Sequence, residues 1–138
     1  KAVENFRYAM ESKDLDLLEE TLDDDFGLAL MEEDWDDYDG DGIIDTTLNG
    51  TVFIQTISIL FDSCEVIELT LEGTGETVWP GDPTGETMQY QRSYDMKAYN
   101  WVGGQQEGWR RQGNTSFLCR PDDTGIWHVT GIVDTTEE

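Results

Sequence analysis

The chain has 138 residues, enough for one domain with its own hydrophobic core. Hydrophobic residues make up 37 % of it, which excludes a disordered chain despite 31 acidic residues, 8 basic residues and a net charge of −23. Because such a chain repels phosphate, we expect no binding to nucleic acid or anionic lipid. No apolar run approaches the roughly 20 residues of a membrane span.

The first predicted elements are two helices. Three apolar residues recur at three- and four-residue spacing, which is typical of an amphipathic helix: Val3, Phe6 and Met10. After the charged break "SKDLD", Asp16 and Glu19 resemble a capping box that opens a second helix. This helix would bury Leu18 and Leu22 and stop at "DDDF".

A short strand and an acidic loop follow. Phe26, Leu28 and Leu30 alternate with small or apolar residues, which predicts a strand, and the acidic loop covers residues 32–47. The next segment, "TLNGTVFIQTISILFD", has two interpretations. Its larger apolar residues share one helical face, whereas its many β-branched residues favour a strand.

The second half of the chain predicts an antiparallel meander. Ile67, Leu69 and Leu71 alternate with polar residues, as in a half-buried strand. A long strand follows, with six residues on one face: Met88, Tyr90, Arg92, Tyr94, Met96 and Ala98. After "GGQQEG" comes a strand that places Thr115, Phe117 and Cys119 on one face, and residues 126–133 form the last strand. Helices followed by a meander indicate an α+β domain.

Two stretches carry a family resemblance: "VENFRYAMESKDLDLLEETLDDDF" and "TSFLCRPDDTGIWHVTGIVD". Together with the element order, they resemble the nuclear transport factor 2-like superfamily, also called SnoaL-like. The resemblance covers nearly the whole chain and implies a single domain over residues 1–138. It implies helices packed on a strongly curved antiparallel sheet, a cone-shaped, cystatin-like roll. Trp127, Val129 and Val133 would fill the core from the last strand. The resemblance implies no single activity, because the superfamily holds isomerases, cyclases, dehydratases, hydrolases and binding modules.

The stretch "DYDGDGIID" predicts a calcium loop. Its ligands would be carboxylates and one backbone carbonyl: Asp37, Asp39, Asp41, Ile43 and Asp45. Leu48 stands where an EF-hand has its closing Glu, so the loop is similar to the looser DxDxDG calcium repeat of extracellular proteins. The alternative is a flexible acidic loop. We expect any calcium here to be structural, because the loop offers no His and no nucleophile.

A cavity on the concave face of the sheet would be the binding site. Arg92 lies between Tyr90 and Tyr94, where it either anchors an anion or carbonyl group or extends its head to the surface. His128, the only histidine, is either a general base or a structural residue. Asp95 falls on the face opposite the tyrosines and Asp134 lies near the chain end, so neither is clearly placed as a buried carboxylate base.

The two cysteines, Cys64 and Cys119, are either buried thiols or one cross-strand bridge. Because the chain begins at Lys1 without Met, we expect a processed or trimmed chain without its targeting segment. Acidity and the calcium-type loop favour an extracellular or cell-envelope location.

We therefore predict a non-catalytic domain that binds a small apolar ligand or a protein, with calcium ordering the acidic loop. One alternative is an isomerase, cyclase or dehydratase that acts in the cone. The other is a self-associating module, a homodimer for example, with Trp79, Trp101 and Trp109 at its interface.

Overall fold

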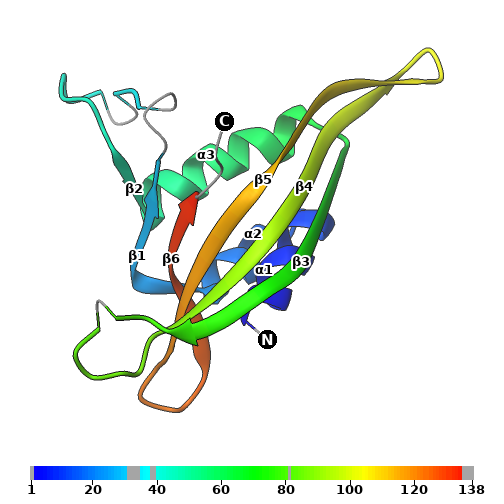
Figure 1. Cartoon of the computed structure of the whole chain (residues 1–138). Coiled ribbons are helices and arrows are strands. Elements are labelled where there is room, and N and C mark those ends of the chain that lie inside the picture. Colours follow the sequence, from blue (N-terminus) through cyan, green and yellow to red (C-terminus); the bar gives the residue numbers. More distant parts are fainter. Residues whose placement is uncertain (1, 31–34, 38–39, 81, 135–138) are drawn as a thin grey trace.

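The computed structural model describes residues 2–30, 35–37, 40–80 and 82–134 (Figure 1). In chain order its elements are α1 (Ala2–Ser12), α2 (Leu15–Thr21), β1 (Leu22–Ala29), β2 (Thr47–Asn49), α3 (Gly50–Ser63), β3 (Val66–Val78), β4 (Met88–Val102), β5 (Gln105–Pro121) and β6 (Trp127–Asp134). These strands form one curved sheet in the order β2-β1-β6-β5-β4-β3, and the helices cover its concave face. The predicted α+β architecture is confirmed. No helix in the described part of the chain is both long and apolar enough to cross a membrane.

The second helix begins earlier than the capping box predicts. Lys13 turns the chain with a φ of 56°, and Asp14 then adopts an extended conformation. The carboxylate of Asp14 accepts a hydrogen bond from the Leu17 N–H at 3.0 Å. Asp14 is therefore the N-cap, and the prediction that Asp16 opens the helix is wrong because the turn at Lys13 moves the cap two residues upstream.

After the three residues of β2, the segment that follows the acidic loop is the helix α3, not a strand. The Asn49 side chain caps it by accepting a hydrogen bond from the Val52 N–H at 2.9 Å. Phe53, Ile57 and Phe61 recur every four residues and are buried. Burial of this face outweighs the weak helix propensity of the β-branched residues between them.

Strands β3 to β6 form the predicted antiparallel meander, and β1 pairs with β6 in parallel. Gly103 and Gly104 have positive φ values of 59° and 81° and make the tight turn that pairs Val102 with Gln105. The tip of this hairpin projects beyond the helices (Figure 1), and we call its residues 99–109 the arm.

The core lies between the concave face and the helices. Phe6 of α1 is its centre, with its ring 5.3 Å from that of Phe117 on β5 and 6.4 Å from that of Phe53 on α3. Leu18 and Val129 belong to the same core and are fully buried. The predicted alternation of Ile67 and Leu69 with polar residues is confirmed, since both are buried, whereas Glu68 and Thr70 are exposed.

A β-bulge interrupts the last strand. Leu118 pairs with Gly131, but the next residue, Cys119, pairs with Val129, so Thr130 is an extra residue on β6. The bulge reverses which residues face inward beyond it. Ile132 is buried opposite Phe117, whereas Val133 pairs with Ser116 on the other face. The expectation that Val133 fills the core is therefore wrong.

Candidate functional site

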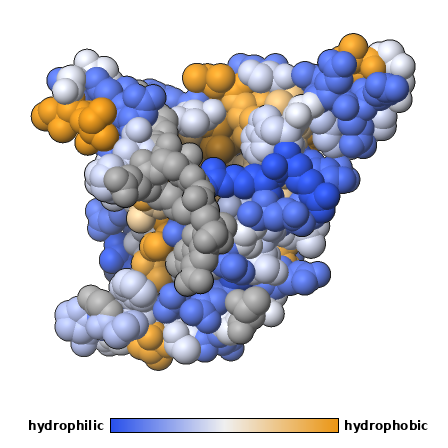
Figure 2. Space-filling view, turned by 45° about the horizontal axis from the view of Figure 1, so that its top comes forward, coloured by the Kyte–Doolittle hydropathy of each residue, from blue (hydrophilic) through white to orange (hydrophobic). Residues whose placement is uncertain are grey.

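The concave face and the helices enclose a pocket of about 300 Å³, which we call the cone pocket. Its walls are mostly apolar and come from both the helices and the sheet, including Phe6, Met10, Leu28, Ile57, Leu69 and Met96. The pocket opens near the base of the arm. In Figure 2 apolar surface is confined to a few separate areas, one of them a recess beside the arm, on an otherwise hydrophilic molecule.

Polar groups converge on one wall of this pocket. The Tyr94 hydroxyl donates to the Asp134 carboxylate at 3.2 Å, and Arg111 donates to the same oxygen atom, Oδ2, at 3.2 Å. The Asp134 side chain is only 18 % exposed, and Thr115 lies beside it on the same face. We call Tyr94, Arg111 and Asp134 the polar cluster. It presents a phenol, a guanidinium and a carboxylate to an apolar space.

Two local features bring the polar cluster together. The bulge at Thr130 turns Asp134 inward, whereas strict alternation would turn it outward. The tight turn at Gly103–Gly104 sets the hairpin register that places Arg111 opposite Met96, two residues from Tyr94. The register was readable from the two glycines, but the bulge has no comparable signal in the sequence.

Neighbouring arginines on β5 face opposite sides of the sheet. Arg111 faces the cone pocket, whereas Arg110 makes a bidentate ion pair with Asp95 on the outer face, at 2.9 and 2.5 Å. The Arg110 guanidinium holds the pKa of the Asp95 carboxyl below its usual range. Asp95 therefore lies away from the cone pocket, as the alternation predicts.

Similarity to solved structures identifies the fold. A nuclear transport factor 2-like superfamily protein from Salmonella enterica matches with a TM-score of 0.68 at 10 % identity, covering 99 % of this chain and 87 % of its own. A candidate dehydratase of the same family from Streptomyces avermitilis matches with a TM-score of 0.65 at 16 % identity, covering 99 % and 91 %. The chain has the nuclear transport factor 2-like fold.

Other members of this fold group differ in described role. A candidate association domain of calcium/calmodulin-dependent protein kinase type II from Thiobacillus denitrificans matches with a TM-score of 0.66 at 12 % identity, covering 99 % of this chain and 93 % of its own. No protein-family model matches the chain. No curated protein matches it either. The similarity thus establishes the nuclear transport factor 2-like fold, and it assigns no activity to the chain.

The structure separates the other predicted site residues. Of the pair that flanks Arg92, only Tyr94 reaches the cone pocket, and Tyr90 lines a different cavity. The Arg92 guanidinium lies over the Tyr90 ring, 5.4 Å from its centroid, and donates to the Gln91 carbonyl oxygen at 2.9 Å. Tyr90, Arg92 and Tyr94 share one face, as predicted, without forming one site.

His128 lies on the outer side of the sheet, away from both cavities. Its Nδ1 is 2.9 Å from the Glu20 carbonyl oxygen and its Nε2 is 2.8 Å from the Asp122 carboxylate. The hydrogen bond with Asp122 raises the pKa of His128. This geometry ties the β5–β6 turn to the end of α2, so we assign His128 a structural role.

The acidic loop curls around one carboxylate. Asp37 accepts hydrogen bonds from the backbone N–H groups of Gly40, Asp41 and Gly42, at 2.8 to 3.2 Å. The glycines have positive φ values of 75° and 84°, as a sharp turn requires. Asp41 accepts from the Ile43 N–H at 2.8 Å. These hydrogen bonds and the two glycines give the loop a sharp turn.

The full ligand set for calcium is not assembled within the described residues. Asp39, one of the predicted ligands, lies outside them. Among the remaining His, Cys, Asp and Glu side chains that the structure describes, no three stand together as a metal site would require. Asp45 is held near Asp36 by a backbone hydrogen bond of 2.8 Å, which closes the base of the loop.

Both cysteines are free thiols. Cys64 follows α3 and is half-buried, and Cys119 is buried in β5. Burial raises the pKa of the Cys119 thiol to about 12. The thiol is therefore neutral near pH 7 and unsuited to nucleophilic attack.

Proposed function

We propose that this domain binds a small, mostly apolar molecule in the cone pocket, with a hydroxyl or carbonyl group of that molecule at the polar cluster. The observation that carries the proposal is the convergence of Tyr94, Arg111 and Asp134 on one wall of an apolar pocket. Because the ion pair neutralises the charge of both partners, the cluster suits an uncharged polar group. A few polar groups in an apolar pocket are typical of small-molecule sites.

The test uses 2-naphthol, a rigid apolar molecule with one hydroxyl, in calorimetric titrations. We expect Tyr94→Phe and Asp134→Asn each to weaken binding by about 0.5–1.5 kcal/mol, the usual worth of one hydrogen bond. Leu71→Trp, at the pocket wall, should abolish binding by filling the space.

Asp95→Asn is the matched control, because Asp95 pairs with Arg110 on the outer face as Asp134 pairs with Arg111 on the inner one. Equal binding by all variants would contradict the proposal.

Catalysis in the same pocket is the second candidate function. The Asp134 carboxylate stands 3.2 Å from a phenol in a mostly apolar cavity, an arrangement suited to moving a proton on a bound carbonyl compound. The Streptomyces neighbour, a candidate dehydratase, gives this alternative a precedent within the fold. An enzyme of this kind would accelerate exchange of the acidic C–H protons of 2-tetralone with D₂O, followed by NMR, and Asp134→Asn would remove the acceleration. No acceleration by the wild-type protein would exclude this candidate function for that ketone class.

We further propose that calcium orders the acidic loop, which suits an extracellular or cell-envelope location. The loop geometry around Asp37 and the positive-φ glycines support this. At constant ionic strength, calcium but not magnesium should raise the melting temperature, because it binds only the folded state.

Asp37→Asn should abolish the calcium effect, whereas Asp62→Asn on the exposed side of α3 should keep it. An identical melting temperature with and without millimolar calcium would refute the proposal.

Self-association through the arm is a further proposal. Trp101 and Trp109 are about half exposed there, at 51 % and 46 %, beside the exposed Val102. Burial of such side chains against a second copy would be favourable. Light scattering at increasing protein concentration should show a rise in mass that Trp101→Ser suppresses.

A further inference from the structure

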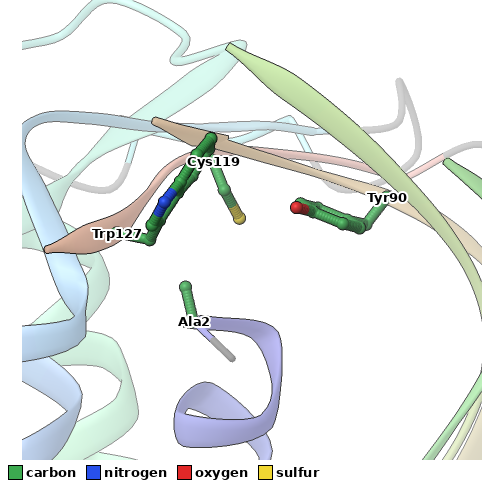
Figure 3. A pocket seen from close by; sticks show the side chains of 4 residues that line it. All are labelled: Ala2, Tyr90, Cys119 and Trp127. Atoms are coloured by element: carbon green, nitrogen blue, oxygen red, sulfur yellow. The ribbon is translucent and has the colours of Figure 1, made fainter. Parts of the chain in front are cut away.

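We propose that the domain has a second ligand site, for a small aromatic carboxylate, at the end of the fold where α1 begins. A cavity of about 280 Å³ lies there, lined by Ala2, Tyr90, Cys119 and Trp127 (Figure 3). Its volume is near the lower limit for small-molecule sites and suits a molecule of one or two rings. We call it the second cavity.

An aromatic pair separates the second cavity from the cone pocket. On α1, Ala2 faces the second cavity, and Phe6, one turn later, faces the cone pocket. On β5, Cys119 faces the second cavity and Phe117 faces the cone pocket. The rings of Phe6 and Phe117 meet edge to face at 5.3 Å, so they form a wall between the two spaces.

The lining of the second cavity selects an aromatic molecule. Tyr90 and Trp127 supply two aromatic side chains from opposite sides, and the Tyr90 hydroxyl points into the space toward the Cys119 sulfur (Figure 3). No carboxylate is among the described residues that line it. Because the Cys119 thiol is neutral near pH 7, the cavity wall carries no negative charge.

Arg92 supplies the preference for a carboxylate. Its guanidinium lies over the Tyr90 ring at 5.4 Å, and its charge acts on the Cys119 thiol, where it partly opposes the effect of burial. The four other arginines in the described chain each pair with a carboxylate: Arg7, Arg110, Arg111 and Arg120. Arg92 instead donates to two backbone carbonyl oxygens, of Gln91 and Gly75.

One acidic residue lies near this arginine. Glu76 is opposite Tyr90 on β3, and its charge raises the pKa of Tyr90 together with the larger effect of burial. Its side chain is exposed and forms no ion pair with Arg92. Among the described residues, Arg92 thus has no carboxylate partner, although the chain has 31 acidic residues. An unpaired guanidinium beside an aromatic cavity favours the binding of an anionic ligand there.

The test is a titration with benzoate followed by two-dimensional ¹H–¹⁵N NMR of the tryptophan indole groups. Trp127 lines the second cavity and Trp109 lines the cone pocket, so the two signals report on the two sites separately. Trp127→Phe and Trp109→Phe assign them. We expect benzoate to shift the Trp127 signal saturably and to leave the Trp109 signal in place.

Two variants test the chemistry. Arg92→Gln should weaken benzoate binding about tenfold or more, as loss of a charge-assisted hydrogen bond does, and leave binding of benzyl alcohol unchanged. Arg110→Gln, on the outer face, is the matched control and should bind benzoate as the wild type does. Ala2→Phe should abolish binding by filling the cavity.

The outcomes distinguish this site from the cone pocket. Leu71→Trp, which fills the cone pocket, should not change the Trp127 response to benzoate. A shift of Trp109 alone, loss of binding in Leu71→Trp, or no shift of Trp127 at 10 mM benzoate or below would each overturn the proposal. Failure of 2-naphthol to bind the cone pocket would leave it standing, because the two experiments use different residues.

Discussion

At the scale of single residues, His128 is the clearest electrostatic feature. Both of its ring nitrogens face acceptors, since the Glu20 carbonyl oxygen and the ionised Asp122 carboxylate cannot donate. A neutral imidazole can donate only one hydrogen bond. The arrangement therefore favours the imidazolium, in agreement with the raised pKa of His128.

The pH dependence of stability follows from this shift. The pKa of His128 in the folded state is above its ordinary value of 6.5, so its contribution is complete below pH 6.5 and is lost as pH rises through the folded-state pKa. We expect the free energy of unfolding from urea titrations to fall by about 1–2 kcal/mol or less between pH 6 and pH 8.

His128→Gln should flatten the pH profile over this interval, because glutamine does not titrate. Arg120, which pairs with Asp23 and Asp25 beside this site, stays charged throughout and does not contribute to the slope. A wild-type profile without a decline above pH 6.5 would contradict the assigned imidazolium.

At the scale of elements, the hairpin of β4 and β5 depends on one glycine. A Cβ atom on Gly108 would lie 2.0 Å from the Ala98 carbonyl oxygen and 2.6 Å from the Tyr99 Cα. Both are backbone atoms, which cannot move without displacing the neighbouring strand. Gly108 therefore permits the close approach of the two strands at the base of the arm.

Gly108→Ala should consequently destabilise the protein by about 1–3 kcal/mol, as overpacking does. The matched control is Gly27→Ala on β1, where an added Cβ would meet no atom within 4 Å, and we expect it to change stability by about 0.5 kcal/mol or less. Thermal unfolding followed by circular dichroism compares them. Similar melting temperatures for both variants would show that the strands separate readily.

Elements also show where sequence reasoning succeeded. Period-two alternation assigned the inward faces of β3 and β4 because those strands pair without interruption from Ile67 to Leu71. It failed at β6, because one extra residue reversed the pattern beyond Thr130. At α2 the capping-box prediction failed, because the positive φ of Lys13 moved the cap to Asp14. Local irregularities of one residue thus caused both errors.

At the scale of the molecule, the element order and the concave face could be predicted, but the site could not. The polar cluster joins β4, β5 and β6, and its members meet only when register and bulge are both known. The spacing of residues along the chain reveals neither the strand register nor the bulge. The resemblance to the nuclear transport factor 2-like superfamily therefore supported the fold, and the contacts of Asp134 had to come from the structure.

Net charge acts on the whole fold. With 31 acidic and 8 basic residues, repulsion among carboxylates outweighs the attraction of the few exposed ion pairs. Raising sodium chloride from 0.01 to 1 M shortens the screening length from about 30 to about 3 Å. We expect the melting temperature to rise over this range.

The salt dependence should shrink in a variant that carries Glu19→Gln, Glu20→Gln and Asp24→Asn, all exposed positions near the start of β1. A melting temperature that falls with salt in the wild type would show that ion pairs, not repulsion, dominate.

The extra residue at Thr130 also has an evolutionary consequence. If Thr130 instead paired with Leu118 in a regular ladder, Val133 and Asp134 would exchange faces, and the cone pocket would lose its carboxylate with no change of residue type. A relative could therefore carry the same residues and lack the polar cluster. Within this fold, the pairing register of β6 would be as informative about ligand chemistry as the identity of the aligned residues.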